Sequence, residues 1–303
     1  MLRESLLYIS RQRQLADLMT TVPITKQLAD RFVAGENVLE AVDAVRALNA
    51  RGIRATLDVL GESVTTRDGA RKAADNYLRL LDVIDEAGID SNVSLKLSQM
   101  GLDVDPVLCR DNMLRILERA ESRANFVRID MEDSAHTQPT LDLFAGLYAV
   151  HRNVGVVIQA YLYRSHQDVE DLIARGARVR LCKGAYAEPA SVAYPHKEDV
   201  DRAYADLMEK LMLRGNYPAI ATHDEKLIGR AIHFAESLGV DRARFEFQML
   251  YGVRRDLQDR LAKEGYNVRV YVPFGREWFP YFMRRMAERP ANLGFVLTNL
   301  FRG

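Results

Sequence analysis

Two adjacent arginines near the end of the chain point most directly to chemistry. Arg284 and Arg285 lie three and four residues after Tyr281, and Glu288 follows at the same spacing, so in a helix most of the four share one face. A guanidinium group can bind a carboxylate through two parallel N–H···O hydrogen bonds in one plane, so an arginine pair suits a small planar anion as ligand. The alternative is an exposed basic turn on an amphipathic helix, and the rest of the chain must decide between the two.

Polar residues also lie at or near the end of each apolar, β-rich segment of the chain. Such side chains are costly to bury unless they are paired, so a ring of them predicts a lined cavity. Its cations, together with the arginine pair, predict an anionic or phosphate-bearing ligand. The ring comprises Asp58, Glu62, Lys96, Ser98, Gln99, Asp130, Glu132, Gln159, Tyr161, Arg180, Lys183, Thr222, His223, Asp224, Glu246, Gln248 and Tyr271.

Other kinds of site find less support. His223 is the one histidine at a predicted strand end, and one histidine does not make a metal site, so we expect no metal. The chain lacks a Gly-x-Ser-x-Gly elbow and a Cys/His pairing that would suggest covalent acyl chemistry. Cys109 and Cys182 have no paired spacing, which argues against a zinc knuckle or a disulfide framework and fits a reducing compartment. The residues alone do not name the reaction.

These polar ends belong to a repeating pattern that follows helical sequence over residues 1–50. Alternation of strands with amphipathic helices predicts parallel crossover units, and eight such units close into a (β/α)8 barrel with its active site at the carboxyl ends of the strands. The rival doubly wound sheet lacks its Gly-x-Gly-x-x-Gly fingerprint. The expected strands are 55–60, 93–97, 126–129, 154–158, 179–182, 219–221, 245–247 and 268–272, and the expected helices are 67–87, 105–122, 138–151, 166–175, 198–214, 224–238, 254–264 and 277–289.

Length and composition are those of an ordinary globular protein. The 303 residues are 48% hydrophobic and 28% charged, and we expect one catalytic domain, with N-terminal helices over 1–50, the barrel over 53–290 and a tail over 291–303. Lys+Arg and Asp+Glu balance at 42 each, so no net charge favours nucleic acid. The N-terminus lacks the apolar run of a signal peptide, and no stretch approaches the length of a membrane span.

Motifs in the order of the strands resemble those of the proline dehydrogenase family. The resemblance runs from about residue 30 to 290 and is closest in kind to the short, single-function bacterial type; Ala187 stands where the long bifunctional members usually carry Trp. The matching motifs are Asp58-Val-Leu-Gly-Glu62, Ser94-Leu-Lys-Leu-Ser98, Arg128-Ile-Asp-Met-Glu132, Gln159-Ala-Tyr161, Arg180-Leu-Cys-Lys-Gly-Ala-Tyr186, Ala221-Thr-His-Asp224, Phe245-Glu-Phe-Gln-Met-Leu-Tyr-Gly252 and Tyr281-x-x-Arg-Arg-x-x-Glu288.

The resemblance implies a distorted TIM-like barrel whose last helix lies over the barrel mouth and which holds FAD without covalent attachment. It implies oxidation of L-proline to Δ1-pyrroline-5-carboxylate by hydride transfer to flavin N5, the first step of proline catabolism towards glutamate. Electrons would pass to a membrane quinone, and a separate pyrroline-5-carboxylate dehydrogenase would take the product. We therefore expect a cytoplasmic protein with weak peripheral contact at the inner face of the membrane.

Residue roles follow from the same resemblance, position by position. The implied catalytic residues are Lys96, Asp130, Tyr271, Arg284, Arg285 and Glu288. Lys96, Arg284 and Arg285 would bind the substrate carboxylate, while Leu250, Tyr271 and Tyr281 would pack around the pyrrolidine ring. Asp130 and Glu288 would orient these groups through ion pairs. The implied flavin contacts are Gln159, Arg180 near N5, Lys183, Gly184, Ala185, Tyr186, Thr222, His223, Glu246 and Gln248.

Two other functions stay open on the sequence. A Schiff-base lyase barrel would use Lys96 or Lys183 as its nucleophilic amine, and borohydride trapping of a substrate adduct would support it. A non-catalytic barrel that senses proline or binds a partner would dock through the apolar tail, which equally motivates the expected membrane contact. The apolar residues of that tail are Leu293, Phe295, Val296, Leu297, Leu300 and Phe301.

Overall fold

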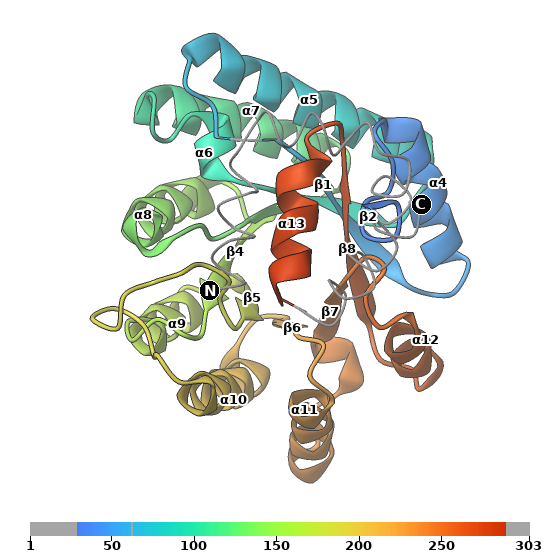
Figure 1. Cartoon of the computed structure of the whole chain (residues 1–303), viewed down its shortest axis with the longest axis vertical. Coiled ribbons are helices and arrows are strands. Elements are labelled where there is room, and N and C mark those ends of the chain that lie inside the picture. The colour runs from blue at the N-terminus through green and yellow to red at the C-terminus, as the bar shows by residue number, and fades with distance from the viewer. Residues whose placement is uncertain (1–28, 62, 289–303) are drawn as a thin grey trace, which may run out of the picture.

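The strands form a closed parallel barrel in sequence order, with β8 returning to pair with β1 (Figure 1). The computed structural model describes residues 29–61 and 63–288, and for residues 284–288 it describes the backbone alone. The predicted (β/α)8 architecture is therefore confirmed. The strands are β1 Arg54–Val59, β2 Ser91–Leu95, β3 Val127–Ile129, β4 Val154–Gln159, β5 Arg178–Cys182, β6 Ala219–Ala221, β7 Glu246–Leu250 and β8 Val268–Phe274.

Helices surround the barrel on its outside and complete the crossover units. Their apolar faces bury residues against the strands, and the strands are buried on both faces, as in parallel sheets covered by helices. The helices are α4 Val38–Asn49, α5 Arg67–Glu86, α6 Leu97–Met100, α7 Pro106–Ser122, α8 Ser134–Val150, α9 Ser165–Ala174, α10 Lys197–Arg214, α11 Glu225–Leu238, the 3-10 helix η1 Arg242–Arg244, α12 Arg255–Lys263 and α13 Trp278–Glu288.

Local sequence signals explain where the helix before the barrel begins and what it packs on. At the start of α4 the Asn37 side chain accepts the N–H groups of Leu39 and Glu40, and the Glu40 carboxylate reaches back to the Asn37 N–H. The buried face of α4 includes Val42 and Val45 and packs on β1 and β8. The other N-terminal helices expected before residue 29 lie outside the described residues, as does the tail over 291–303.

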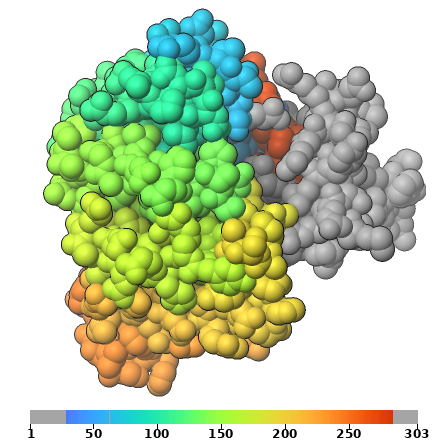
Figure 2. All heavy atoms as spheres, turned by 90° about the vertical axis from the view of Figure 1, so that its left-hand side faces the viewer, coloured from blue at the N-terminus to red at the C-terminus, as the bar shows by residue number. Residues whose placement is uncertain are grey.

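The last helix, α13, crosses the mouth of the barrel, as predicted (Figure 1). Gly275, with φ of +127°, turns the chain after β8 so that α13 can lie back across the strand ends. Phe282 packs the helix against the segment before α4, since its ring centroid lies 6.4 Å from that of Phe32; within α13 it lies 6.1 Å from that of Trp278. Seen from the side, the segments around the barrel pack without gaps, and the atoms of α13, coloured red, lie at the edge of this packed body (Figure 2).

Some element boundaries differ from those predicted. Helix α8 begins at Ser134, four residues before the predicted start at 138, because the Asp133 side chain caps it by accepting the His136 N–H. Strand β8 continues past Pro273, whose carbonyl oxygen still accepts the N–H of Ala34. In the part of the chain described, no helix is long and apolar enough to cross a membrane.

Candidate active site

A cavity of about 630 Å³ lies at the carboxyl ends of strands β3 to β8. This is the end at which barrel enzymes carry their active sites, and the volume is typical of small-molecule sites. Its walls combine apolar side chains with charged and amide groups that converge from different strands. The residues around it are Asp130, Met131, Val157, Gln159, Arg180, Cys182, Lys183, Gly184, Ala185, Lys197, Ala221, Thr222, His223, Asp224, Gln248, Met249, Leu250 and Tyr271.

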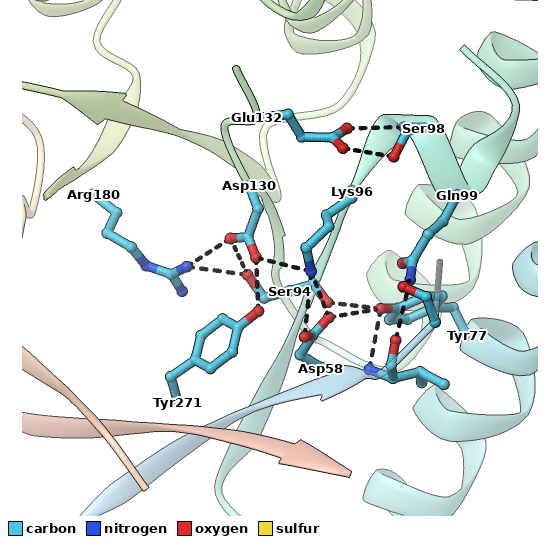
Figure 3. Close-up of polar contacts among 12 residues, drawn as sticks. Asp58, Tyr77, Ser94, Lys96, Ser98, Gln99, Asp130, Glu132, Arg180 and Tyr271 are labelled. Atoms are coloured by element: carbon cyan, nitrogen blue, oxygen red, sulfur yellow. Dashed lines mark hydrogen bonds and ion pairs between the residues drawn. The ribbon is translucent and has the colours of Figure 1, made fainter. Parts of the chain in front are cut away.

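Asp130, which directly follows β3, is the acceptor on which several side chains converge (Figure 3). Ser94 Oγ donates to its Oδ1 at 2.6 Å and Arg180 Nη1 donates to the same oxygen at 2.7 Å. The Tyr271 hydroxyl donates to Oδ2 at 2.8 Å, and Lys96 Nζ lies 3.9 Å from that oxygen. Because the side chain of Asp130 is largely buried, these charge-assisted contacts fix the positions of the groups around it.

Tyr271 remains a neutral hydrogen-bond donor in this network. Burial, Asp130 and Asp58 raise the pKa of Tyr271 well above its usual range. Its ring also lies beneath the Arg180 guanidinium, with 5.4 Å from the guanidinium carbon to the ring centroid. The hydroxyl and the ring face therefore hold two different charged groups in place.

A second buried carboxylate, Asp58 at the end of β1, supports the first. Lys96 Nζ lies 3.3 Å and 3.4 Å from its two carboxylate oxygens. The Tyr77 hydroxyl lies 3.3 Å from Asp58, donates to the Ser94 carbonyl oxygen at 2.9 Å and accepts the Val59 N–H at 3.2 Å. Lys96 is thus held between two carboxylates, and Tyr77 ties the ends of β1 and β2 together.

Tyr77→Phe should lower the free energy of unfolding by about 1–3 kcal/mol, because it leaves buried groups without their hydrogen-bond partner. Urea unfolding of the two proteins measures the difference. Tyr163→Phe is the matched control, since its hydroxyl donates to the Ala190 carbonyl oxygen at the surface and its loss should cost much less. Equal losses in the two variants would contradict a structural role for Tyr77.

Arg180 carries a donor that is ready for a ligand. The residue lies in β5, is 5% exposed, and donates from Nε to Gln248 and from Nη1 to Ser94 and Asp130. Its Nη2 is buried and has no hydrogen-bond partner among the residues described. A buried guanidinium nitrogen without an acceptor is costly, so the cavity favours an acceptor at this point.

Another part of the cavity wall is formed by the residues that come directly after β5 and β6. Lys183 Nζ donates to Asp201 and Asp224, at 3.0 Å in the second case. Gly184 has φ of +118°, and a Cβ atom there would lie 2.4 Å from the Tyr161 ring, so the backbone packs against that ring where a side chain has no room. The His223 Nε2 accepts the Leu250 N–H at 2.9 Å, which joins the ends of β6 and β7.

Most of the residues predicted for the site meet around this cavity. The structure places Asp130, Gln159, Arg180, Lys183, Gly184, Ala185, Thr222, His223, Gln248, Leu250 and Tyr271 on its lining. Lys96 reaches the same network through Asp58 and Asp130. Tyr186 lies on the exposed loop after β5, and Tyr281 is buried on α13. The α13 backbone carries Arg284, Arg285 and Glu288, whose side chains, like all of Glu62, lie outside the described residues.

The predicted position of Glu246 at the carboxyl end of its strand is wrong. Strand β7 was expected to end at Phe247, but it runs from Glu246 to Leu250, so Glu246 lies at the amino end. There it is 3% exposed, and the Arg269 Nε donates to its carboxylate oxygens at 3.1 and 3.2 Å. Although burial opposes it, Arg269 lowers the pKa of Glu246, which therefore stays charged. Gln248, two residues later, occupies the mouth instead.

Comparison with known proteins agrees with this geometry. The family model described as "Proline dehydrogenase" matches residues 41–298. The chain belongs to the proline dehydrogenase family. It is 42% identical over 272 residues to proline dehydrogenase 2 of Bacillus subtilis (strain 168), with 90% of each chain covered. It is 44% identical over 281 residues to the proline dehydrogenase of Deinococcus radiodurans, with 91% of each covered.

Solved structures of a longer protein, proline utilization A, contain the same barrel. The chain aligns with proline utilization A from Bdellovibrio bacteriovorus inactivated by N-propargylglycine, with a TM-score of 0.81 and 25% identity. The alignment covers 86% of this chain and 32% of that one, so the chain spans about a third of the longer protein. As a member of the proline dehydrogenase family, the chain is an enzyme.

Proposed function

We propose that this chain is a single catalytic domain that oxidises L-proline to Δ1-pyrroline-5-carboxylate, with non-covalently held FAD at the barrel mouth. The observation that carries the proposal is the buried Nη2 of Arg180, which has no partner among the described residues and belongs to a side chain on the cavity lining, beside the Asp130 network. A flavin offers acceptors to such a donor, and a cation there favours negative charge on the reduced ring.

The residues around the cavity fit this cofactor. Gln159, Arg180, Thr222, His223 and Gln248 offer polar groups from four strand ends, and Lys183 supplies a cation for a phosphate. Gly184 and Ala185 line the cavity with the two smallest side chains, and Tyr186 lies on the same loop. When bound, FAD would accept the hydride from C5 of proline. Glu246, at the other end of the barrel, drops out of the set of flavin contacts.

The remaining residues would position the substrate. Lys96, with Arg284 and Arg285 on α13, would bind the carboxylate, and Glu288 would orient the arginines. Leu250, Tyr271 and Tyr281 would pack against the pyrrolidine ring. Fixing the carboxylate and the ring together restrains C5, and such positioning can supply a large part of a rate enhancement. Helix α13 over the mouth would also exclude water from the reacting groups.

The pairing of both candidate lysines weighs against the Schiff-base alternative. A lysine nucleophile must be a neutral amine, but Lys96 lies between Asp58 and Asp130, and Lys183 donates to Asp201 and Asp224. Each amine is therefore already engaged by two carboxylates and would have to leave both to attack a substrate. Purified protein should convert L-proline, with an artificial electron acceptor, into a product that o-aminobenzaldehyde traps as a pyrroline adduct. Absence of that product would contradict the proposed function.

Tyr271→Phe should lower kcat/KM for L-proline by about tenfold, as expected for loss of one hydrogen bond to a charged group. The ring is kept, and Asp130 retains Ser94, Arg180 and Lys96 around it. Steady-state kinetics with L-proline measure the change, and Tyr251→Phe, outside the mouth cavity, is the control. A loss as large as that of an Asp130 variant would argue against this limited role.

We further propose that electrons pass to a membrane quinone and that the apolar tail beyond residue 291 makes weak contact with the inner face of the membrane. A chain ending at Asn292 should then reduce quinone in liposomes several times more slowly than the full chain, because less apolar surface can enter the lipid interface. A water-soluble acceptor is the control and should be reduced equally by both. Equal rates with liposomes would contradict the membrane contact.

The product would pass to a separate pyrroline-5-carboxylate dehydrogenase.

A further inference from the structure

A second cavity, of about 320 Å³, lies at the amino-terminal end of the barrel. It shares no lining residue with the cavity at the mouth, and no role in proline oxidation places a group there. Its inner wall consists of residues at or near the starts of five strands. These are Asn92 of β2, Arg128 of β3, Arg178 of β5, Glu246 of β7 and Arg269 of β8.

Positive charge exceeds negative charge in this inner wall. Arg269 is matched by Glu246, as described above. Asp90 and Asp85, at the rim, are matched by Arg54 at 3.3 Å and by Arg123 at 2.9 Å. Arg128 and Arg178 have no carboxylate partner within residues 29–61 and 63–283. The inner wall therefore carries three arginines and one carboxylate, Glu246, whose charge favours the charged forms of Arg128 and Arg178 without pairing directly with either.

Arg128 is the more deeply buried of the two, with 2% of its surface exposed. Its Nη1 donates to the carbonyl oxygens of Val156 at 3.2 Å and of Arg178 at 2.6 Å. Its Nε is buried and has no hydrogen-bond partner among the described residues. Burial, Arg180 and Arg178 lower the pKa of Arg128, so its positive charge is unfavourable there unless an anion compensates it.

The surrounding residues make room for these guanidinium groups and orient them. A Cβ atom at Gly155 would lie 2.5 Å from Arg128 Nη1, so only glycine leaves space for that group. The Arg178 guanidinium carbon lies 4.7 Å from the Phe126 ring centroid and 4.5 Å from that of Tyr217. Packing against aromatic faces fixes the position of a guanidinium group but leaves the N–H donors in the guanidinium plane without acceptors. The Nε of Arg178, too, is buried without a partner in the described part of the chain.

We propose that this cavity binds a small oxyanion with two negative charges, of which hydrogen phosphate is the simplest. Three arginines against one carboxylate leave the inner wall with an excess of two positive charges, which matches that ion, and guanidinium N–H donors match phosphate oxygens in geometry. The volume lies near the lower end of the range for ligand sites, which favours a small ion over a nucleotide. Sulfate belongs to the same chemical class and binds through the same contacts.

Thermal unfolding of the full chain, saturated with flavin so that the mouth is filled, tests the site. Phosphate should raise Tm by about 2 °C at tenfold excess over its Kd, relative to sodium chloride of the same ionic strength. Arg178→Gln should abolish the phosphate-dependent rise, whereas Arg178→Lys, which keeps a cation, should retain part of it. Arg110→Gln removes an exposed arginine of α7 and should retain the full rise.

Two results would overturn the proposal. One is a rise in phosphate no larger than that in sodium chloride, which would indicate screening of surface charge alone. The other is an equal phosphate-dependent rise in Arg178→Gln, which would place the ion elsewhere on the protein. The ligand could be the free ion or a phosphoryl group on a larger molecule, and glycerol phosphate distinguishes the two. A smaller rise in Tm than with phosphate indicates a site for the free ion, and an equal rise indicates a site for a phosphoryl group. Because the readout is unfolding, failure here would leave proline oxidation untouched.

Discussion

Asp130→Ala should lower kcat/KM for L-proline by about a hundredfold or more and should reduce the flavin content of the purified protein. The substitution removes the acceptor shared by Ser94, Arg180 and Tyr271. Breaking a buried ion pair on one side typically costs about 3–5 kcal/mol, because the remaining charge loses its partner. Here that charge is Arg180, the group we expect beside the flavin, so binding and catalysis should suffer together.

A matched control separates this effect from general loss of stability. Asp168 is another buried carboxylate, 7% exposed, and accepts from Arg164 Nε at 2.8 Å on α9. It does not line the mouth cavity. Asp168→Ala should therefore destabilise the fold to a comparable degree while leaving kcat/KM near its original value. Near-normal proline turnover in Asp130→Ala would show that the Asp130 network does not position the reacting groups.

Arg284→Met or Arg285→Met should raise the KM for L-proline by about thirtyfold or more while flavin stays bound. Removing one partner of a desolvated, hydrogen-bonded charge pair costs about 2–5 kcal/mol, and each 1.4 kcal/mol is about tenfold in affinity. The proposed flavin contacts come from the strand ends, so the two variants should keep their visible spectrum. Proline saturation curves measured at constant flavin content give the result.

Arg276→Met is the control for these variants. Arg276 is exposed and lies two residues before α13, so the substitution removes the same kind of side chain from the same segment without reaching the proposed carboxylate site. Its KM should stay within about twofold of the original, as for a surface substitution. An unchanged KM in both the Arg284 and the Arg285 variants would exclude the carboxylate assignment.

Sequence periodicity was enough to predict the barrel because every crossover unit repeats the same signal. Strands such as β4 and β6 are short, apolar and bounded by turn residues, and their observed limits lie within one residue of the prediction. Short elements carry too few residues for such a signal. The four-residue helix α6 and the 3-10 helix η1 went unpredicted for that reason.

Strand β7 shows why one error affected the predicted site. The predicted strand Phe245–Phe247 alternates Phe, Glu and Phe, and the prediction ends it before Gln248 because a second polar residue weakens the apolar pattern. In the structure Gln248 is buried within the strand, because it accepts from Arg180 and donates to Glu246. Those partners come from β5 and from the start of β7 itself, and a single sequence gives no sign of the pairing. The strand therefore continues, and Glu246 moves to the opposite end of the barrel.

The strand-end rule located most of the cavity but not the groups that support it. Asp130 could be predicted because it directly follows β3, and Arg180 because a charged residue inside an apolar strand is costly to bury unless it is paired. Tyr77 lies on the buried face of α5, where an aromatic residue is most simply explained as core packing. Ser94 lies within β2, beside the end of the neighbouring strand β3 where Asp130 follows, and only the closure of the barrel brings it to Arg180. Contacts across the barrel interior depend on tertiary structure, which local patterns do not encode.

An anaerobic visible spectrum of the purified protein, recorded before and after addition of L-proline, tests the central claim most directly. The account predicts oxidised flavin bands that bleach when L-proline is added, because substrate and cofactor would meet beside Arg180 and Asp130. D-proline serves as the control and should leave the bands unchanged or bleach them much more slowly. A colourless protein that cannot be reconstituted with FAD, or flavin bands that stay oxidised with L-proline, would contradict the account.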